Sequence, residues 1–268
     1  AGRAARRWMD FGSPAQRRDS MMDSSDEGLE SQRLTGTASS RGSYGPLGRS
    51  GLLVVSATTH LLALVLLVLL TSTLKTYLSA EKPLLTWRTF PLHPFLMVLA
   101  FGFLAPIAAA AWKSYEHGLG MSHGTVKLIH GVLMLCATIV GVLGVIDMWL
   151  VHEDGAAAQT AKGWAVHFQS SHSYVGFATV LFFALQSVGG VAAFSLPALS
   201  ARRRAEAVEP HRLLGGAAAH QAAMIAIITG ILSLAGRGDN VASKDVEFKV
   251  AAMLALALCI CLGLVLRR

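Results

Sequence analysis

Long, uninterrupted apolar runs dominate the chain after its first fifty residues. There are six of them, at 51–74, 91–112, 126–149, 173–196, 211–235 and 248–266. A helix rises 1.5 Å per residue, so roughly 20 residues cross a hydrocarbon core of ~30 Å, and each run is long enough to do so. Apolar and polar residues do not alternate as they would in barrel strands. The pattern therefore predicts an all-α fold, a six-span transmembrane helix bundle in a lipid bilayer.

Residues 1–50 have a different composition. They are rich in Arg, Ser, Gly and Asp and poor in large aliphatic residues. Such a segment cannot bury enough apolar surface to offset the entropy lost on ordering. We therefore expect a disordered N-terminal tail at 1–50 and a single transmembrane domain at 51–268.

Charge refines this topology. Charged residues make up only 15% of the chain, against about 25% in soluble domains. The net charge is +7, but the basic residues gather in the tail and at span ends, which is typical of membrane topology and does not indicate nucleic acid binding. An even number of spans puts both termini on one side, here named side A; the opposite side is side B. Ten Lys and Arg residues near the spans fall on side A and seven on side B, so side A and both termini are predicted to be cytoplasmic.

Four histidines are candidates for a functional site, because ionisable or metal-binding residues within a membrane span are costly and usually mark one. His93 and His172 open the second and fourth runs, and His130 and His211 lie at the start of the third and fifth. Neighbouring spans run in opposite directions. His93 and His172 are therefore expected near side B, and His130 and His211 near side A. Two imidazoles facing each other at one depth are what a bis-histidine haem requires.

The spacing of these histidines indicates a repeat. His93 and His130 are 37 positions apart, and His172 and His211 are 39 apart. The second and third spans and the fourth and fifth spans thus form two similar hairpins, related by an axis along the membrane normal. We expect a four-helix dihaem core made of spans 2–5. No Cys-x-x-Cys-His attachment motif is present, so the haems are expected to be non-covalent, b-type haems.

Short motifs around the four histidines carry a family resemblance. They are His-Pro-x-x-Met at 93–97, Lys-x-x-His-Gly at 127–131, His-Ser-aromatic-x-Gly at 172–176 and His-x-x-x-Gly at 211–215. In order and sidedness the chain from about residue 50 to 268 resembles the cytochrome b561 family. The resemblance implies two haem b groups, with His93 paired with His172 and His130 with His211. It also implies that ascorbate in the cytosol is the electron donor and that monodehydroascorbate or a ferric chelate on the opposite side is the acceptor.

Two features depart from or complicate the family pattern. Tyr174 stands where Trp is common in the family. His220 lies nine residues after His211, and counting back from the end of the fifth run favours His220 as the fourth ligand. Counting forward from His172 favours His211, which also has the family's glycine, Gly215, four residues on. We predict that His211 is the ligand.

Basic residues near the side A histidines could recruit an anionic donor. Lys127 lies three residues before His130, on the same helix face, and Arg212 adjoins His211. Both are expected to attract ascorbate, although the positive-inside rule also accounts for basic residues here. Of the remaining histidines, His60 is expected to be a hydrogen-bonded packing residue. His123 lies on the face of His130 and could line the mouth of the site on side A.

The competing hypothesis is a non-redox protein, either a transporter or a structural subunit of a membrane complex. Intramembrane acids would support transport, and only Asp147, near the end of a run, qualifies. The sequence leaves open the acceptor, the organelle and whether two copies form a homodimer.

Overall fold

The computed structural model describes residues 48–78, 83–156, 167–195, 201–235 and 245–266 of the 268-residue chain. The predicted tail lies outside these ranges apart from residues 48–50, which begin the first helix. The domain boundary predicted at residues 50 and 51 thus stays a prediction.

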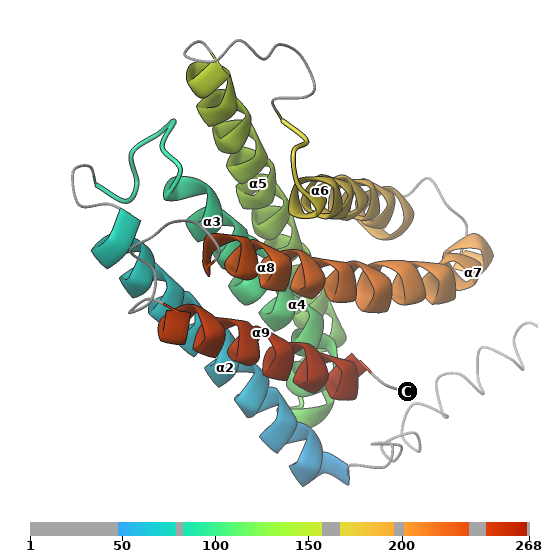
Figure 1. The fold of residues 1–268 in the computed structure, drawn as a ribbon. Coiled ribbons are helices and arrows are strands. Elements are labelled where there is room, and N and C mark those ends of the chain that lie inside the picture. Colours follow the sequence, from blue (N-terminus) through green and yellow to red (C-terminus); the bar gives the residue numbers. More distant parts are fainter. Residues whose placement is uncertain (1–47, 79–82, 157–166, 196–200, 236–244, 267–268) are drawn as a thin grey trace, which may run out of the picture. The chain divides into compact units, whose positions relative to one another are not determined.

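Regular structure in the described ranges is helical (Figure 1). The α-helices are α2 (Gly48–Leu78), α3 (Leu92–Met97), α4 (Ala105–Ala111), α5 (His123–Ala156), α6 (Ser171–Gly190), α7 (Ala201–His211), α8 (Ala219–Ala235) and α9 (Asp245–Leu266). Within the described ranges, four π-helical segments continue some of them, namely η2 (Val98–Leu104), η3 (Trp112–Gly118), η5 (Val191–Ser195) and η6 (Arg212–Ala218).

Six helical stretches are long and apolar enough to cross a membrane, so the predicted six-span, all-α fold is confirmed. They cover Gly48–Lys75, Leu92–Gly118, His123–Gly155, Ser171–Phe194, Glu206–Leu234 and Val246–Leu266. Some of these helices run past the apolar sequence into polar residues. The second span continues to Gly118, beyond the predicted end at residue 112. The fifth span begins at Glu206. We had expected His211 to open this helix, but His211 lies inside it.

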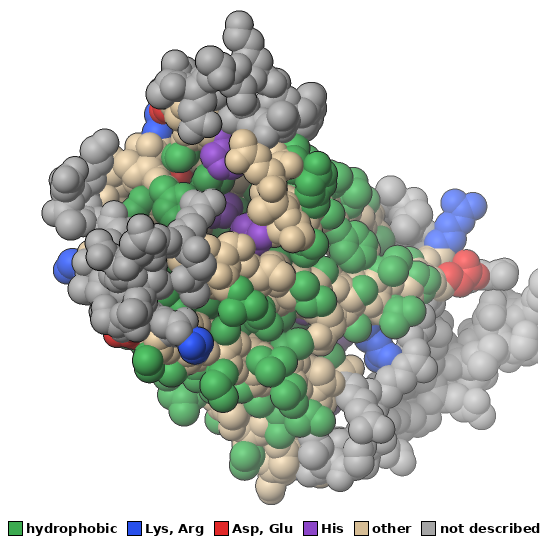
Figure 2. All heavy atoms as spheres, in the orientation of Figure 1, with side chains coloured by type: hydrophobic (Ala, Val, Ile, Leu, Met, Phe, Trp, Pro, Cys, Tyr) green, Lys and Arg blue, Asp and Glu red, His purple; other side chains and the backbone are tan. Residues whose placement is uncertain are grey.

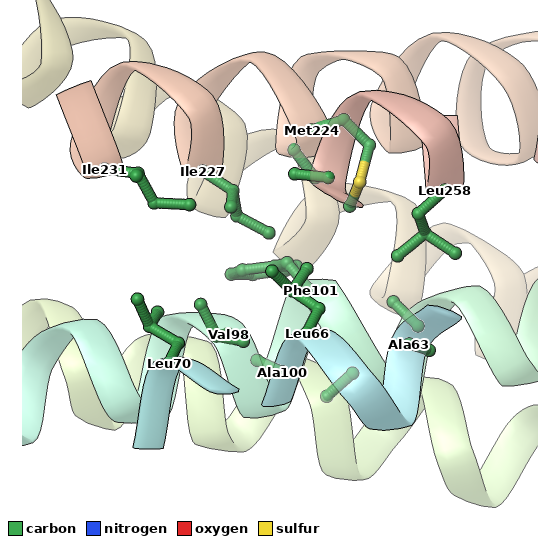
Figure 3. Packing of buried hydrophobic residues seen from close by; sticks show 14 of the residues in the cluster. Ala63, Leu66, Leu70, Val98, Ala100, Phe101, Met224, Ile227, Ile231 and Leu258 are labelled. Atoms are coloured by element: carbon green, nitrogen blue, oxygen red, sulfur yellow. The ribbon is translucent and has the colours of Figure 1, made fainter. Parts of the chain in front are cut away.

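The packing order follows the hairpins. Helix α2 packs along α9, α9 along α8, and α8 along α6, while α3, η2 and α4 lie against α5. Figure 3 shows the buried contact at the centre, where Leu66 and Leu70 of α2 and Phe101 of η2 meet Met224 and Ile227 of α8. This core fixes the relative positions of the spans that carry the histidines.

Large apolar side chains also point outward. Val68, Leu128, Leu181 and Met253 are each at least half exposed. Contiguous apolar surface of this kind is unfavourable in water but is what a bilayer solvates. The outward faces thus agree with a multi-pass membrane protein.

Candidate functional site

The structure brings His93 and His172 together at side B. Their ring centroids are 6.4 Å apart and the ring planes meet at 75°. Both residues lie in the first turn of a helix, His93 in α3 and His172 in α6. The start of α6 is fixed by Ser170, whose side chain accepts a hydrogen bond from the backbone N–H of Ser173.

Hydrogen bonds to neighbouring helices orient both rings. His93 Nδ1 lies 2.8 Å from the carbonyl oxygen of Gly144 in α5, and His172 Nδ1 lies 3.3 Å from Thr229 Oγ1 in α8. Because a carbonyl can only accept, His93 carries its proton on Nδ1 and presents a lone pair at Nε2. Metal-ligating histidines usually donate their second ring N–H to an acceptor in this way.

A cavity of about 400 Å³ surrounds this pair. Its lining is mostly apolar and includes Met97, Phe101 and Ile227, and Figure 2 shows histidine side chains within a hollow of this face. Glycine keeps part of the wall open, because a Cβ at Gly230 would lie 2.8 Å from His172 Cε1. An apolar chamber with two histidines facing across it has the features of a haem pocket.

Further polar groups line the side B cavity and its rim. His167 lines the cavity, stacks on Trp149 at 3.6 Å between ring centroids, and has a buried Nδ1 without a hydrogen-bond partner among the described residues. His167 Nε2 lies 2.8 Å from a carboxylate oxygen of Glu153, which can only accept, so Nε2 carries the ring proton and Nδ1 presents a lone pair to the cavity. The sequence has no feature that pairs His167 with Trp149 or Glu153, so this role becomes visible only in the structure.

Asp147, the one acid that we noted inside a run, is buried in α5. Its Oδ1 accepts the backbone N–H of Arg88 at 2.7 Å. Arg88 has a φ of +62°, a left-handed conformation that is unusual for a residue other than glycine. Asp147 therefore anchors, through Oδ1, the turn that leads to α3 and His93, while its buried Oδ2 has no hydrogen-bond partner among the described residues.

At side A, His130 is oriented in the same manner as His93. Its Nδ1 lies 2.8 Å from the carbonyl oxygen of Ala108 in α4, and its ring centroid is 5.4 Å from that of Trp112 in η3. His211, the last residue of α7, packs edge-on against Phe194 at 5.2 Å between ring centroids. The described residues show no ring contact between His130 and His211 of the kind seen at side B, but His211 and His220 both lie within electrostatic range of His130.

His220 has a different environment. It is buried, with Nδ1 at 3.1 Å from the carbonyl oxygen of Gly215 and Nε2 at 3.2 Å from that of Ala105. Both ring nitrogens thus face backbone oxygens, so the ring connects η6 to α4. His211 has no such carbonyl partner among the described residues. The choice of His211 as the fourth ligand stays a prediction, and this geometry favours it.

The two predicted donor-binding residues both lie at the side A end. Lys127 Nζ donates to the carbonyl oxygen of Phe194 at 2.6 Å, and the Phe194 ring packs on His211. An ammonium has three N–H donors, so Lys127 retains two for a ligand. Arg212 is exposed at the start of η6 and lies within electrostatic range of Lys113 in η3.

His60 has the hydrogen-bonded packing role that we expected. Its Nδ1 lies 2.7 Å from the carbonyl oxygen of Ser56, and its Nε2 lies 2.9 Å from the Tyr115 hydroxyl. The contact joins α2 to η3.

Of the four π-helical segments in the part of the chain that the structure describes, three contact or adjoin the side A histidines. Trp112 in η3 contacts His130, Phe194 in η5 contacts His211, and η6 begins directly after His211. Segments of π-helix inside α-helices occur often at functional sites because they change the direction of side chains. No feature of the sequence predicts these π-helical segments.

Comparison with known proteins identifies the chain. The model of the family described as eukaryotic cytochrome b561 matches residues 92–235, which include all four predicted histidines. The chain belongs to the cytochrome b561 family. Membership implies a haem b cofactor, and the paired, oriented histidines of the apolar side B cavity fit the axial ligands of such a group.

Several relatives of this cytochrome b561 are named for ascorbate. A transmembrane ascorbate ferrireductase of Arabidopsis thaliana is 31% identical over 143 residues, which are 53% of this chain and 56% of the relative. A lysosomal membrane ascorbate-dependent ferrireductase of Homo sapiens is 30% identical over 142 residues, 53% and 54% of the two chains. A probable ascorbate-specific transmembrane electron transporter of rice, Oryza sativa subsp. japonica, is 28% identical over 126 residues, 47% and 49%. The chain spans about half the length of the curated relatives it matches.

Proposed function

We propose that this cytochrome b561 carries single electrons across the bilayer. The donor is ascorbate on side A, the carriers are two haem b groups, and the acceptor on side B is monodehydroascorbate or a ferric chelate. The observation that carries the proposal is the facing pair of His93 and His172, 6.4 Å between ring centroids, in an apolar cavity. The names of the ascorbate-dependent relatives support the donor.

The residues that would hold the two groups are His93 with His172 toward side B and His130 with His211 toward side A. A bound haem supplies reversible one-electron chemistry. The protein would supply the imidazole ligands and a low-polarity enclosure, which together would set the reduction potential. The carbonyls of Gly144 and Ala108, which fix the rings of His93 and His130, also make those imidazoles more basic ligands.

The donor would bind at the side A end, where Lys127 and Arg212 supply positive charge close to His130 and His211. A singly charged anion suits a lysine ammonium, which is a compact point charge on a flexible stem. We further propose that side A is cytoplasmic, as the excess of basic residues there indicates. The alternative of a transporter relied on Asp147, whose carboxylate instead anchors the Arg88 turn.

A vesicle experiment tests this function. The holoprotein is reconstituted in sealed vesicles with a ferric chelate inside, and vesicles with side A outward are selected by their protease sensitivity. External ascorbate should reduce the internal chelate, while vesicles without protein should show only leakage. If the haem spectrum changes on adding ascorbate but the internal chelate stays ferric, transmembrane transfer is contradicted. If neither changes, the choice of ascorbate as donor is contradicted.

A further inference from the structure

A histidine and a carboxylate form a hydrogen-bonded pair at the side A end that the proposed function does not yet use. His123 is the first residue of α5, and its Nδ1 lies 3.1 and 3.2 Å from the two carboxylate oxygens of Glu116 in η3. A carboxylate can only accept, so Nδ1 carries the proton and Nε2 presents a lone pair. Nε2 has no hydrogen-bond partner in the described part of the chain. The His123 side chain is 68% exposed and that of Glu116 only 26%, so the anchor is sheltered and the imidazole is accessible.

The pair lies next to the proposed donor site. His123, Lys127 and His130 follow one another at spacings of four and three residues, so they share one face of α5. The Trp112 ring lies between the two histidines, with its centroid 5.2 Å from that of His123 and 5.4 Å from that of His130. An anion held by Lys127 would therefore have a base within one helical turn on one side and a proposed haem ligand within one turn on the other.

Oxidation of the donor requires such a base. The ascorbate monoanion loses one electron and the proton of its remaining enolic hydroxyl, and the product is the monodehydroascorbate radical anion. The electron would pass to the haem that His130 and His211 would hold. The O–H bond breaks, and the proton must be accepted by a nearby group. A carboxylate that fixes one ring nitrogen and stabilises the imidazolium formed at the other is the arrangement of an effective general base.

We propose that His123, oriented by Glu116, accepts the proton of ascorbate at Nε2 and is thus a catalytic residue of donor oxidation. The inference rests on the proposed function, because it takes ascorbate as donor and side A as its site. Other ionisable groups on the elements around His123 are Lys113, His117, Lys127, Arg49 and Arg212. Arg49 donates to the carbonyl oxygen of Gly118, and Lys127 to that of Phe194. Of these groups, only His117 shares the imidazole side chain of His123.

The test compares two reductants on the haem-loaded protein in stopped flow. Ascorbate gives up a proton with its electron, whereas hexaammineruthenium(II) gives up an electron alone. His123→Gln should lower the limiting rate of reduction by ascorbate roughly 100-fold, the usual size of a general-base contribution. It should leave the half-saturating ascorbate concentration and the rate with hexaammineruthenium(II) nearly unchanged. The matched control is His117→Gln, an exposed histidine of the same region, which should behave as wild type with both reductants.

A second variant separates a base from a structural residue. Glu116→Gln should lower the ascorbate rate roughly tenfold, since it removes the charge that stabilises the imidazolium. Equal ascorbate rates in wild type and His123→Gln would overturn this inference but would leave the proposed function intact. Equal losses with both reductants would overturn the inference in favour of a structural role. Failure of ascorbate to reduce wild type, while hexaammineruthenium(II) succeeds, would overturn the proposed donor and this inference with it.

Discussion

At the scale of single residues, the hydrogen bonds of the rings separate ligand candidates from histidines with a structural role. His93 and His130 each direct Nδ1 at a carbonyl of a neighbouring helix, which leaves Nε2 for a metal. His220 has carbonyl oxygens at both nitrogens. The sequence could name all three as histidines at suitable depths, but it could not assign these partners, which come from helices far away along the chain.

This difference gives a prediction for the fourth ligand. His211→Ala should remove the side A haem signal and leave the side B signal, because one axial ligand is lost. His220→Leu should keep both signals and lower the stability by about 1–3 kcal/mol, since the carbonyls of Gly215 and Ala105 lose their partner. Optical and electron paramagnetic resonance spectra report the haems, and thermal unfolding reports the stability. Loss of the side A haem in His220→Leu with retention in His211→Ala would reverse the assignment.

Lys127 gives a second prediction at this scale. Lys127→Met keeps the stem but removes the charge, so the apparent affinity for ascorbate should fall roughly five- to 100-fold, for a partly desolvated contact worth about 1–3 kcal/mol. Both haem spectra should remain. The control is Lys75→Met in the last turn of α2, at side B. This variant should leave the half-saturating ascorbate concentration unchanged. An unchanged value in Lys127→Met as well would mean that Lys127 only binds the Phe194 carbonyl.

At the scale of the helices, the sequence predicted the spans well because bilayer thickness and continuous apolar runs determine them. It also predicted that His93 and His172 meet, since both open a span on the same side. The arrangement of residues at side A was harder to predict from the sequence. Helix η3 continues six residues past the end of the second run through Lys113 and Glu116, and hydropathy cannot detect a polar helical extension. The contact of His123 with Glu116 depends on that extension and on the turn after it, where Gly120 has a φ of +73°.

A glycine in α8 tests how closely the helices must approach at side B. A Cβ at Gly230 would lie 2.8 Å from His172 Cε1 and 3.3 Å from both ring nitrogens, distances that require the ring to move. Gly230→Ala should therefore shift or weaken the side B haem signal while the side A signal stays. Gly189→Ala is the matched control, because nothing lies within 4 Å of its Cβ position. Identical spectra for Gly230→Ala and wild type would mean that the His172 ring moves without affecting ligation.

At the scale of the whole molecule, the two histidine groups lie on either side of a packed centre. Phe101, which lines the side B cavity, contacts Phe183 at 4.8 Å between ring centroids, and Phe183 contacts His220 at 5.3 Å. Phe101 and Phe183 are both almost fully buried. Close packing here holds the two proposed sites at a fixed separation. The proposed transfer of electrons from one site to the other requires such a fixed separation.

The central claim is that this bundle holds two haems between four histidines, and haem content tests it most directly. Protein expressed with haem available is purified, and pyridine haemochrome analysis is set against protein concentration from amino-acid analysis. We predict about two haem b groups per chain, all extractable by acidified solvent because the sequence contains no covalent attachment motif. A content of one haem per chain would mean that either the side A or the side B histidine pair does not bind haem. Protein that is folded but contains no haem would contradict the central claim altogether.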